Sequence, residues 1–306
     1  MSQALAINIY CFSDAGQNRL LTEVLGPACE RFFESGALTR FFFDRFDARG
    51  PHVFAILALA DAEAEREVLA ALGKELEAFL ADLPELAGPD EEEILARHQA
   101  CRGKALCALD RLESFALRNS WAVARHDAID YPFRIFARLE REAFFWQVFS
   151  EQSLWAIRQL AARGGRASGA GLRWAASIDL GLRQGGIDGE AYWRYHLSTL
   201  LPNQAEALAS SPAATAELLA PLVREPNRAA FDRVFAAAAA PDGKDPQALR
   251  LVEALAGEFA GRRPAEEGWA MLRELVHLSL KQLGLHLGFQ IPLVVYAWRR
   301  WLPPAS

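Results

Sequence analysis

Two apolar runs that meet at a glycine–proline pair constrain the fold of this chain more than any other feature. Residues 38–57 read LTRFFFDRFDARGPHVFAIL, and Gly50-Pro51 separates the two halves of this segment. Short apolar and aromatic runs on either side of such a break are typical of strands joined by a turn. We therefore predict adjacent antiparallel strands over Thr39–Asp44 and His52–Ala58, with Gly50-Pro51 in the turn.

Periodicity around this strand pair predicts a small α+β arrangement at the N-terminus. Residues 5–12 (LAINIYCF) alternate like a strand, and apolar residues within 18–35 recur at helical spacing, with Pro27 as a predicted kink or break. Residues 61–80 are strongly helical, and Asp61 is a suitable N-cap before an acidic first turn. The predicted order is β-α-β-β followed by a helix.

Helical periodicity dominates the rest of the chain. Further helices are predicted over 90–117, 192–201, 246–260 and 266–284, and one long helix or two over 133–162. Gly185-Gly186 should separate two helices, and residues 164–171 (GGRASGAG) have the composition of a flexible loop. We predict an α+β fold in which an N-terminal β-α-β-β sheet unit is packed with a helix-rich C-terminal part. Residues 1–306 are expected to form a single domain, which can be subdivided into an α+β part at 1–88 and a mainly helical part at 89–306.

The composition excludes several classes of function. The chain has 306 residues, 52% of them hydrophobic, which is enough for a sizeable core. Its 33 basic and 39 acidic residues give a net charge of −6, without the basic excess of a DNA-binding protein. The start of the sequence lacks the pattern of a secretory signal, and apolar runs such as 289–296 are too short for a membrane span. We expect a cytoplasmic protein that binds no DNA and does not cross a membrane.

The sequence predicts neither a metal nor an organic cofactor. His98, Cys101 and Cys107 follow one another at a spacing that fits no common zinc site, and no fourth ligand is evident. The glycine-rich segment 164–171 lacks the lysine and the preceding strand of a phosphate-binding loop. We therefore interpret the cysteines as reduced, structural thiols.

Three segments in this order resemble one known family. These are FFFDRFDARGPH (41–52), DYPF (130–133) followed by EAFFWQVFSEQSLWAIRQL (142–160), and LVHLSLKQLG (275–284). The chain resembles the C-terminal domain of class I lantibiotic dehydratases, which also occurs as a stand-alone thiopeptide-type bacteriocin biosynthesis protein. It departs from the family pattern at Phe54 and Ile56, where the family has two arginines, and at Lys281 and Gln282, where the family has Asn-Arg.

The resemblance implies that the chain acts on a ribosomally made precursor peptide. The first expectation is elimination of glutamate from glutamylated Ser or Thr, which leaves a dehydroamino acid and requires a separate glutamylating subunit as a partner. An alternative is the formal [4+2] cycloaddition that forms the central ring of thiopeptides. A non-catalytic subunit that binds the peptide or a partner enzyme is a further alternative, and a homodimer is left open.

Six residues are candidates for the site. His277 matches the family histidine and could act as an acid or base, because an unperturbed histidine titrates near neutral pH. Arg45 could hold a carboxylate in a bidentate pair, and Tyr131 could donate a hydrogen bond. His52, Arg49 and Lys281 are predicted to bind substrate. Structural interpretations stay open: both histidines could belong to the core, and Arg45 could point to solvent from its strand.

Overall fold

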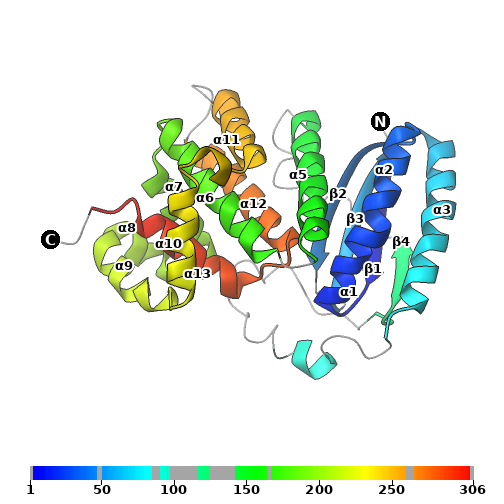
Figure 1. The fold of residues 1–306 in the computed structure, drawn as a ribbon, viewed down its shortest axis with the longest axis horizontal. Helices are drawn as coiled ribbons and strands as arrows, with labels where there is room; N and C mark the ends of the chain where they lie inside the picture. The colour runs from blue at the N-terminus through cyan, green and yellow to red at the C-terminus, as the bar shows by residue number, and fades with distance from the viewer. Residues whose placement is uncertain are drawn as a thin grey trace. The chain divides into compact units, whose positions relative to one another are not determined.

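The computed structural model describes residues 3–46, 50–84, 90–94, 96, 116–123, 142–164, 167–259 and 265–303 (Figure 1). The described residues up to 164 form one compact unit, and those from 167 onward form a second. A sheet belongs to the first unit and the second is helical, so the predicted α+β class is confirmed. The first unit also includes the helix 142–162, which comes after residue 88 in the chain. The expected subdivision into residues 1–88 and 89–306 stays a prediction.

The first unit is built on a four-stranded antiparallel sheet with the strand order β2-β3-β1-β4. The strands are β1 (Gln3–Tyr10), β2 (Leu38–Phe46), β3 (His52–Leu59) and β4 (Ser120–Val123). The predicted strand pair is confirmed, and each strand extends slightly beyond its predicted bounds. Every residue of β3 is buried, and β3 lies between β1 and β2 in the sheet.

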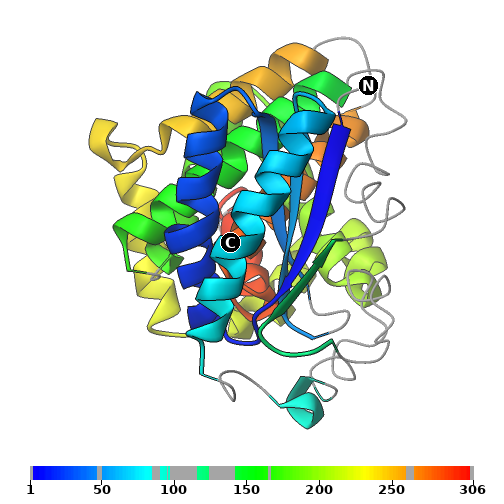
Figure 2. The same cartoon turned by 90° about the vertical axis from the view of Figure 1, so that its right-hand side faces the viewer.

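Helices cover one face of this sheet (Figures 1 and 2). They are α1 (Asp14–Arg19), a π-helical turn η1 (Leu20–Leu25), α2 (Gly26–Glu34) and α3 (Ala62–Ala81). The first three are continuous and begin before the predicted start at residue 18, because the Ser13 hydroxyl caps the helix by accepting from Gly16 N at 3.0 Å. The π-helical turn directly precedes Gly26-Pro27, where the proline has no N–H to continue the ordinary helical pattern.

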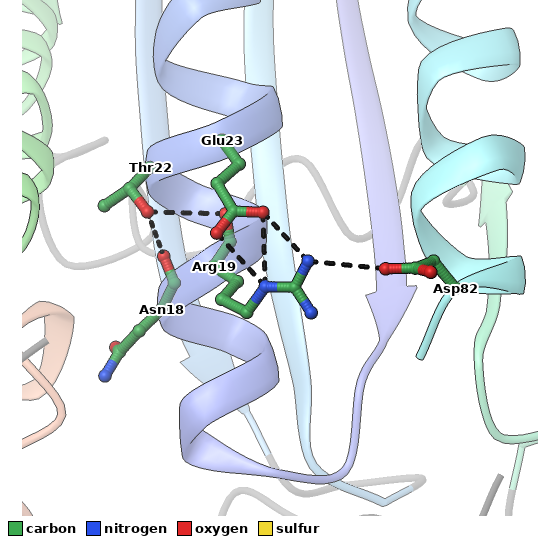
Figure 3. A network of polar contacts seen from close by, with 5 residues as sticks. All are labelled: Asn18, Arg19, Thr22, Glu23 and Asp82. Atoms are coloured by element: carbon green, nitrogen blue, oxygen red, sulfur yellow. Dashed lines mark hydrogen bonds and ion pairs between the residues drawn. The ribbon is translucent and has the colours of Figure 1, made fainter. Parts of the chain in front are cut away.

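A surface network connects the first helix to α3 (Figure 3). Arg19 forms ion pairs with Glu23 at 3.0 Å and with Asp82, just after α3, at 3.5 Å. These side chains are 44–76% exposed, so each pair contributes only roughly 0–1 kcal/mol. The predicted cap at Asp61 is confirmed, since its carboxylate accepts from two backbone N–H groups at the start of α3. Local capping by Asp61 therefore fixes the start of α3.

Helix α5 (Glu142–Ala162) lies along β2, one of the two edge strands of the sheet. The hydroxyls of Ser150 and Ser153 accept hydrogen bonds from the N–H groups of Phe41 and Phe43 at 3.0 and 3.3 Å. An open strand edge exposes such donors to other chains, and these two serines satisfy them within the molecule.

The second unit consists of helices. They are α6 (Ser168–Gln184), α7 (Gly189–Leu200), η4 (Pro202–Gln204), α8 (Ala205–Ser210), α9 (Pro212–Leu219), η5 (Ala220–Leu222), α10 (Asn227–Ala237), η6 (Pro241–Gly243), α11 (Pro246–Phe259), α12 (Ala265–Gln282) and α13 (Leu287–Arg299). The predicted break at Gly185-Gly186 is confirmed, and Gly186 has a φ of +64°. No helix in the described part of the chain combines the length and the apolarity needed to cross a bilayer.

The prediction of a flexible loop over 164–171 is wrong for its second half. Ser168 to Gly171 form the first turn of α6. A Cβ added at Gly171 would lie 2.3 Å from Leu285 Cδ1 and 3.1 Å from Leu280 Cδ2. The glycine therefore permits close packing of α6 on the end of α12, and its presence reflects this packing rather than flexibility.

We predict that Gly171→Ala destabilises the second unit, because the new methyl group overpacks the contact with Leu285. The expected loss in the free energy of unfolding is about 1–3 kcal/mol. Gly288→Ala is the matched control, since a Cβ at Gly288, in the first turn of α13, meets nothing within 4 Å. It should be neutral or stabilise by up to about 1 kcal/mol. Urea unfolding measures both changes, and equal effects would contradict the packing role of Gly171.

Candidate functional site

The predicted site residues fall into two groups, one in each compact unit. Arg45 and His52 belong to the sheet of the first unit, and His277 and Lys281 belong to α12 of the second. Tyr131 and Arg49 lie outside the described residues, so their expected roles stay predictions.

His52 begins β3 and is held by the turn before it. Its Nδ1 lies 2.8 Å from the carbonyl oxygen of Gly50 and, as the N–H tautomer, donates to it. Gly50 has a φ of +97°, and a Cβ at this position would meet the ring of Phe12 at 2.3 Å. Both the backbone conformation and the close approach therefore require glycine.

An aromatic cluster surrounds His52 on one face of the sheet. We define the cluster as Tyr10, Phe46, His52 and Phe54. The His52 ring lies 4.9 Å from that of Tyr10 and 5.8 Å from that of Phe46. Phe46 also meets Phe54 edge to face at 5.8 Å. Three neighbouring strands thus contribute to one largely buried aromatic cluster.

Phe54 and Ile56 share this face with His52, because alternate residues of a strand point the same way. Their side chains are almost fully buried, with relative exposures of 4% and 0%. These are the positions at which the family that this chain resembles has arginines. In this chain both positions hold buried apolar side chains, and the residue of β2 paired with Phe54 is the buried Asp44.

Arg45 belongs to the opposite, helix-covered face. It pairs with Val53 in the sheet, and its guanidinium donates to Gln17 Oε1 at 3.3 Å and to Asn18 Oδ1 at 2.6 Å. Arg45 is only 5% exposed, so the interpretation that it points to solvent is wrong. Its hydrogen bonds connect β2 to α1.

Burial lowers the pKa of Arg45 to about 10, while the carboxylates of Asp14 and Asp44 oppose this shift. The side chain remains a cation at neutral pH and is partly compensated by those acids. Its donors are used inside the first unit, which makes it a structural link between helix and sheet.

In the second unit, α12 carries a stripe of three basic side chains. Arg273, His277 and Lys281 follow one another at intervals of four residues and so lie on one face of the helix. Arg273 Nη1 pairs with Glu274 Oε2 at 2.7 Å. The His277 ring is thus flanked by a cation one turn before it and another one turn after it.

A glycine turn after α12 brings a partner to His277. Gly284, at φ +77°, donates from its N–H to Lys281 O, and Leu285 N–H donates to Leu280 O, both at 2.9 Å. This pair of bonds is a Schellman motif, in which glycine adopts the left-handed conformation at the helix end. The turn leads into α13, on which Gln290 reaches back to His277.

The amide of Gln290 determines which nitrogen of His277 is basic. Gln290 Nε2 donates to Leu285 O at 2.6 Å, which leaves its Oε1 as the acceptor facing His277 Nδ1 at 2.8 Å. This hydrogen-bond arrangement assigns the proton to Nδ1 and the lone pair to Nε2.

The pKa of His277 is lowered to about 3, mainly by burial and then by the charge of Lys281. Part of the residue reaches the surface, but its ring is enclosed enough to disfavour the charged form. The bond to Gln290 opposes this shift, and Arg273 adds to it. His277 is therefore a neutral imidazole at physiological pH.

A second histidine belongs to this group, and sequence reasoning did not identify it. His196 on α7 is fully buried, and burial, with Arg273 and His277, lowers its pKa well below the ordinary value. Its Nδ1 lies 3.5 Å from the hydroxyl of Tyr192, whereas its Nε2 has no hydrogen-bond partner among the described residues.

Of the three residues near His277 that the sequence analysis did not identify, only Arg273 could have been found from its spacing. Arg273 lies four residues before His277, a spacing that places both on one helical face. Gln290 follows the turn in the next helix, and His196 is far away in the chain, so only the folded structure brings them together. Within the described ranges, no three His, Cys, Asp or Glu side chains gather as metal ligands.

Comparison with the sequences of curated proteins gives no match. Among solved structures, the chain is similar to the pyridine synthase TbtD from thiomuracin biosynthesis, with a TM-score of 0.62, 16% identity, and coverage of 98% of this chain and 97% of that one. It is also similar to the tRNA-dependent lantibiotic dehydratase MibB from Microbispora sp. 107891, with a TM-score of 0.50 and 13% identity. That similarity covers 97% of this chain and 28% of MibB.

These similarities show a shared fold. Residues 5–299, almost the whole chain, match the family described as lantibiotic biosynthesis dehydratase C-term. The predicted family is therefore confirmed, and the chain belongs to the C-terminal domain family of lantibiotic biosynthesis dehydratases.

Proposed function

We propose that this protein joins two dehydroamino acids of a ribosomally made precursor peptide in a formal [4+2] cycloaddition. Such a reaction forms the central six-membered ring of a thiopeptide. Its substrate already carries dehydroamino acids in place of Ser or Thr. Two of them must be held close together, and one amide must adopt its tautomeric form, so orientation provides much of the rate.

The buried apolar side chains of Phe54 and Ile56, at the positions where the resemblance implies arginines, are the observation that carries this proposal. A site for glutamate elimination needs positive charge to hold the leaving glutamate. Replacing a charge-assisted pair with an apolar side chain costs on the order of 2–5 kcal/mol of binding. Dehydroamino acid side chains carry no charge, so their binding does not require arginines at these positions.

The contacts of Arg45 support the same conclusion. Its guanidinium donates to Gln17 and Asn18 within the first unit, and a leaving glutamate would have to compete with both. Glutamate elimination, the first expectation from the sequence, stays a prediction that requires another arginine. Arg49 is a candidate for that role, and a separate glutamylating subunit would then be the partner.

The state of His277 also favours ring formation. With a pKa of about 3, its imidazole is a weak base at neutral pH and is poorly matched to removing an α-proton. As a neutral ring with Nδ1 bound to Gln290, it can instead accept a hydrogen bond at Nε2 from a substrate amide. Such an acceptor could assist amide tautomerisation. The fold shared with a pyridine synthase is compatible with this role.

Two substrates distinguish the proposed functions. We expect a precursor analogue with two dehydroalanines to gain the NMR signals of a six-membered nitrogen ring when the protein is added. A matched precursor with glutamylated serines should be recovered unchanged by mass spectrometry. Loss of glutamate from the second substrate would contradict the proposal and support elimination. Binding of both without conversion would support a non-catalytic subunit.

We predict that His277→Gln abolishes conversion of the dehydroalanine precursor, because the Nε2 acceptor is lost. The variant should remain folded, since glutamine can still bond to Gln290. His286→Gln, an exposed change in the turn before α13, is the matched control and should keep full activity. Full activity in His277→Gln would remove this histidine from the mechanism.

We also predict that His277 makes the protein sensitive to acid. Its folded-state pKa of about 3 lies below the unfolded value of about 6.5. The unfolded chain therefore binds more protons between these pH values, and stability falls as the pH drops through that window. His277→Gln should reduce the slope of unfolding free energy against pH between 6.5 and 3, measured by urea denaturation. An unchanged slope would show that the imidazole is not buried in neutral form.

A further inference from the structure

A cavity of about 300 Å³ in the second unit is lined by three arginines. Arg228 comes from α10, and Arg299 and Arg300 come from the end of α13, which lies beside α10 in Figure 1. The other lining residues are Asp232, Tyr296, Ala220 and Val223. The volume is at the lower end of the range for small-molecule sites.

The single acid in the lining is already engaged. The hydroxyl of Tyr296 donates to Asp232 Oδ1 at 2.6 Å. Burial and this carboxylate raise the pKa of Tyr296 to about 12, so the phenol stays neutral and keeps its proton. With three arginines against one acid, the lining has a formal charge of +2.

Arg300 is held in place by aromatic rings. Its guanidinium carbon lies 5.2 Å from the ring centre of Phe235 and 5.9 Å from that of Tyr296. Arg300 Nε lies 3.9 Å from Asp179 Oδ2, at the limit of an ion pair. This stacking orients the planar group, and the Arg300 side chain also forms a hydrogen bond with the Tyr296 side chain.

The other two arginines, Arg228 and Arg299, can pair with an incoming anion. Arg299 pairs with Glu217 at 3.1 Å, but the Glu217 side chain is 70% exposed, so this pair is weak. Arg228 is exposed and forms no ion pair with another described residue. An incoming anion can therefore recruit both without breaking a buried interaction.

We propose that this cavity binds a carboxylate carried on a short aliphatic chain, the chemistry of a glutamate or aspartate side chain. The guanidinium groups would pair with the carboxylate, and Ala220 and Val223 would contact the methylene groups. The site is separate from His277 in its residues and does not depend on the reaction proposed above. Its ligand could come from a free amino acid or from a peptide side chain.

Calorimetric titration with three probes tests this proposal. We expect N-acetyl-glutamate amide to bind the whole protein, and N-acetyl-glutamine amide, of the same shape without the charge, to bind at least about tenfold more weakly. Free glutamate is the third probe. Tighter binding of the capped probe identifies a peptide side chain as the source, and tighter binding of free glutamate identifies the amino acid.

Arg228→Gln should weaken binding of the carboxylate probe by about tenfold, since one charge-assisted pair is lost. Arg299→Gln is a second variant with the same expected direction. Arg233→Gln is the matched control, because Arg233 is exposed on the same helix and does not line the cavity. Circular dichroism verifies folding. Equal binding of the glutamate and glutamine probes, an equal loss in Arg233→Gln, or no saturable binding at all would overturn the proposal.

Discussion

The hydrogen bonds of Gln290 are the interaction on which the candidate chemistry depends. One side of its amide is fixed by Leu285 O, so the other side must present an acceptor to His277. This arrangement requires the chain to turn sharply at Gly284 and requires Leu285 to approach α6 where only a glycine, Gly171, leaves room. Two glycines therefore determine, through packing and backbone conformation, which nitrogen of His277 carries the lone pair.

Strand alternation imposes a second constraint, in the first unit. Arg45 and His52 come from paired strands but lie on opposite faces of the sheet. On the face covered by helices, Arg45 connects β2 to α1 through its hydrogen bonds. The face of His52 carries the aromatic cluster. The family's usual arginine positions fall on the aromatic face. Phe54 and Ile56 thus place buried apolar side chains on the face where the resemblance implies arginines.

Local features could be predicted from the sequence, because local interactions determine them. The strand pair around Gly50-Pro51, the cap at Asp61 and the break at Gly185-Gly186 depend on residues close together in the chain. The helical start at Ser168 was missed, because Gly171 there serves a contact with Leu285, which is distant in sequence. The bond between His277 and Gln290 was missed for the same reason.

A structure of the protein with a bound precursor analogue that carries two dehydroalanines tests the central claim most directly. The account predicts that a backbone amide of the peptide lies within hydrogen-bond distance of His277 Nε2, and that no arginine is needed to hold the reacting residues. The same experiment with a glutamylated analogue provides the opposing case. A glutamyl carboxylate paired with an arginine beside His277 would contradict the account and establish glutamate elimination as the better one.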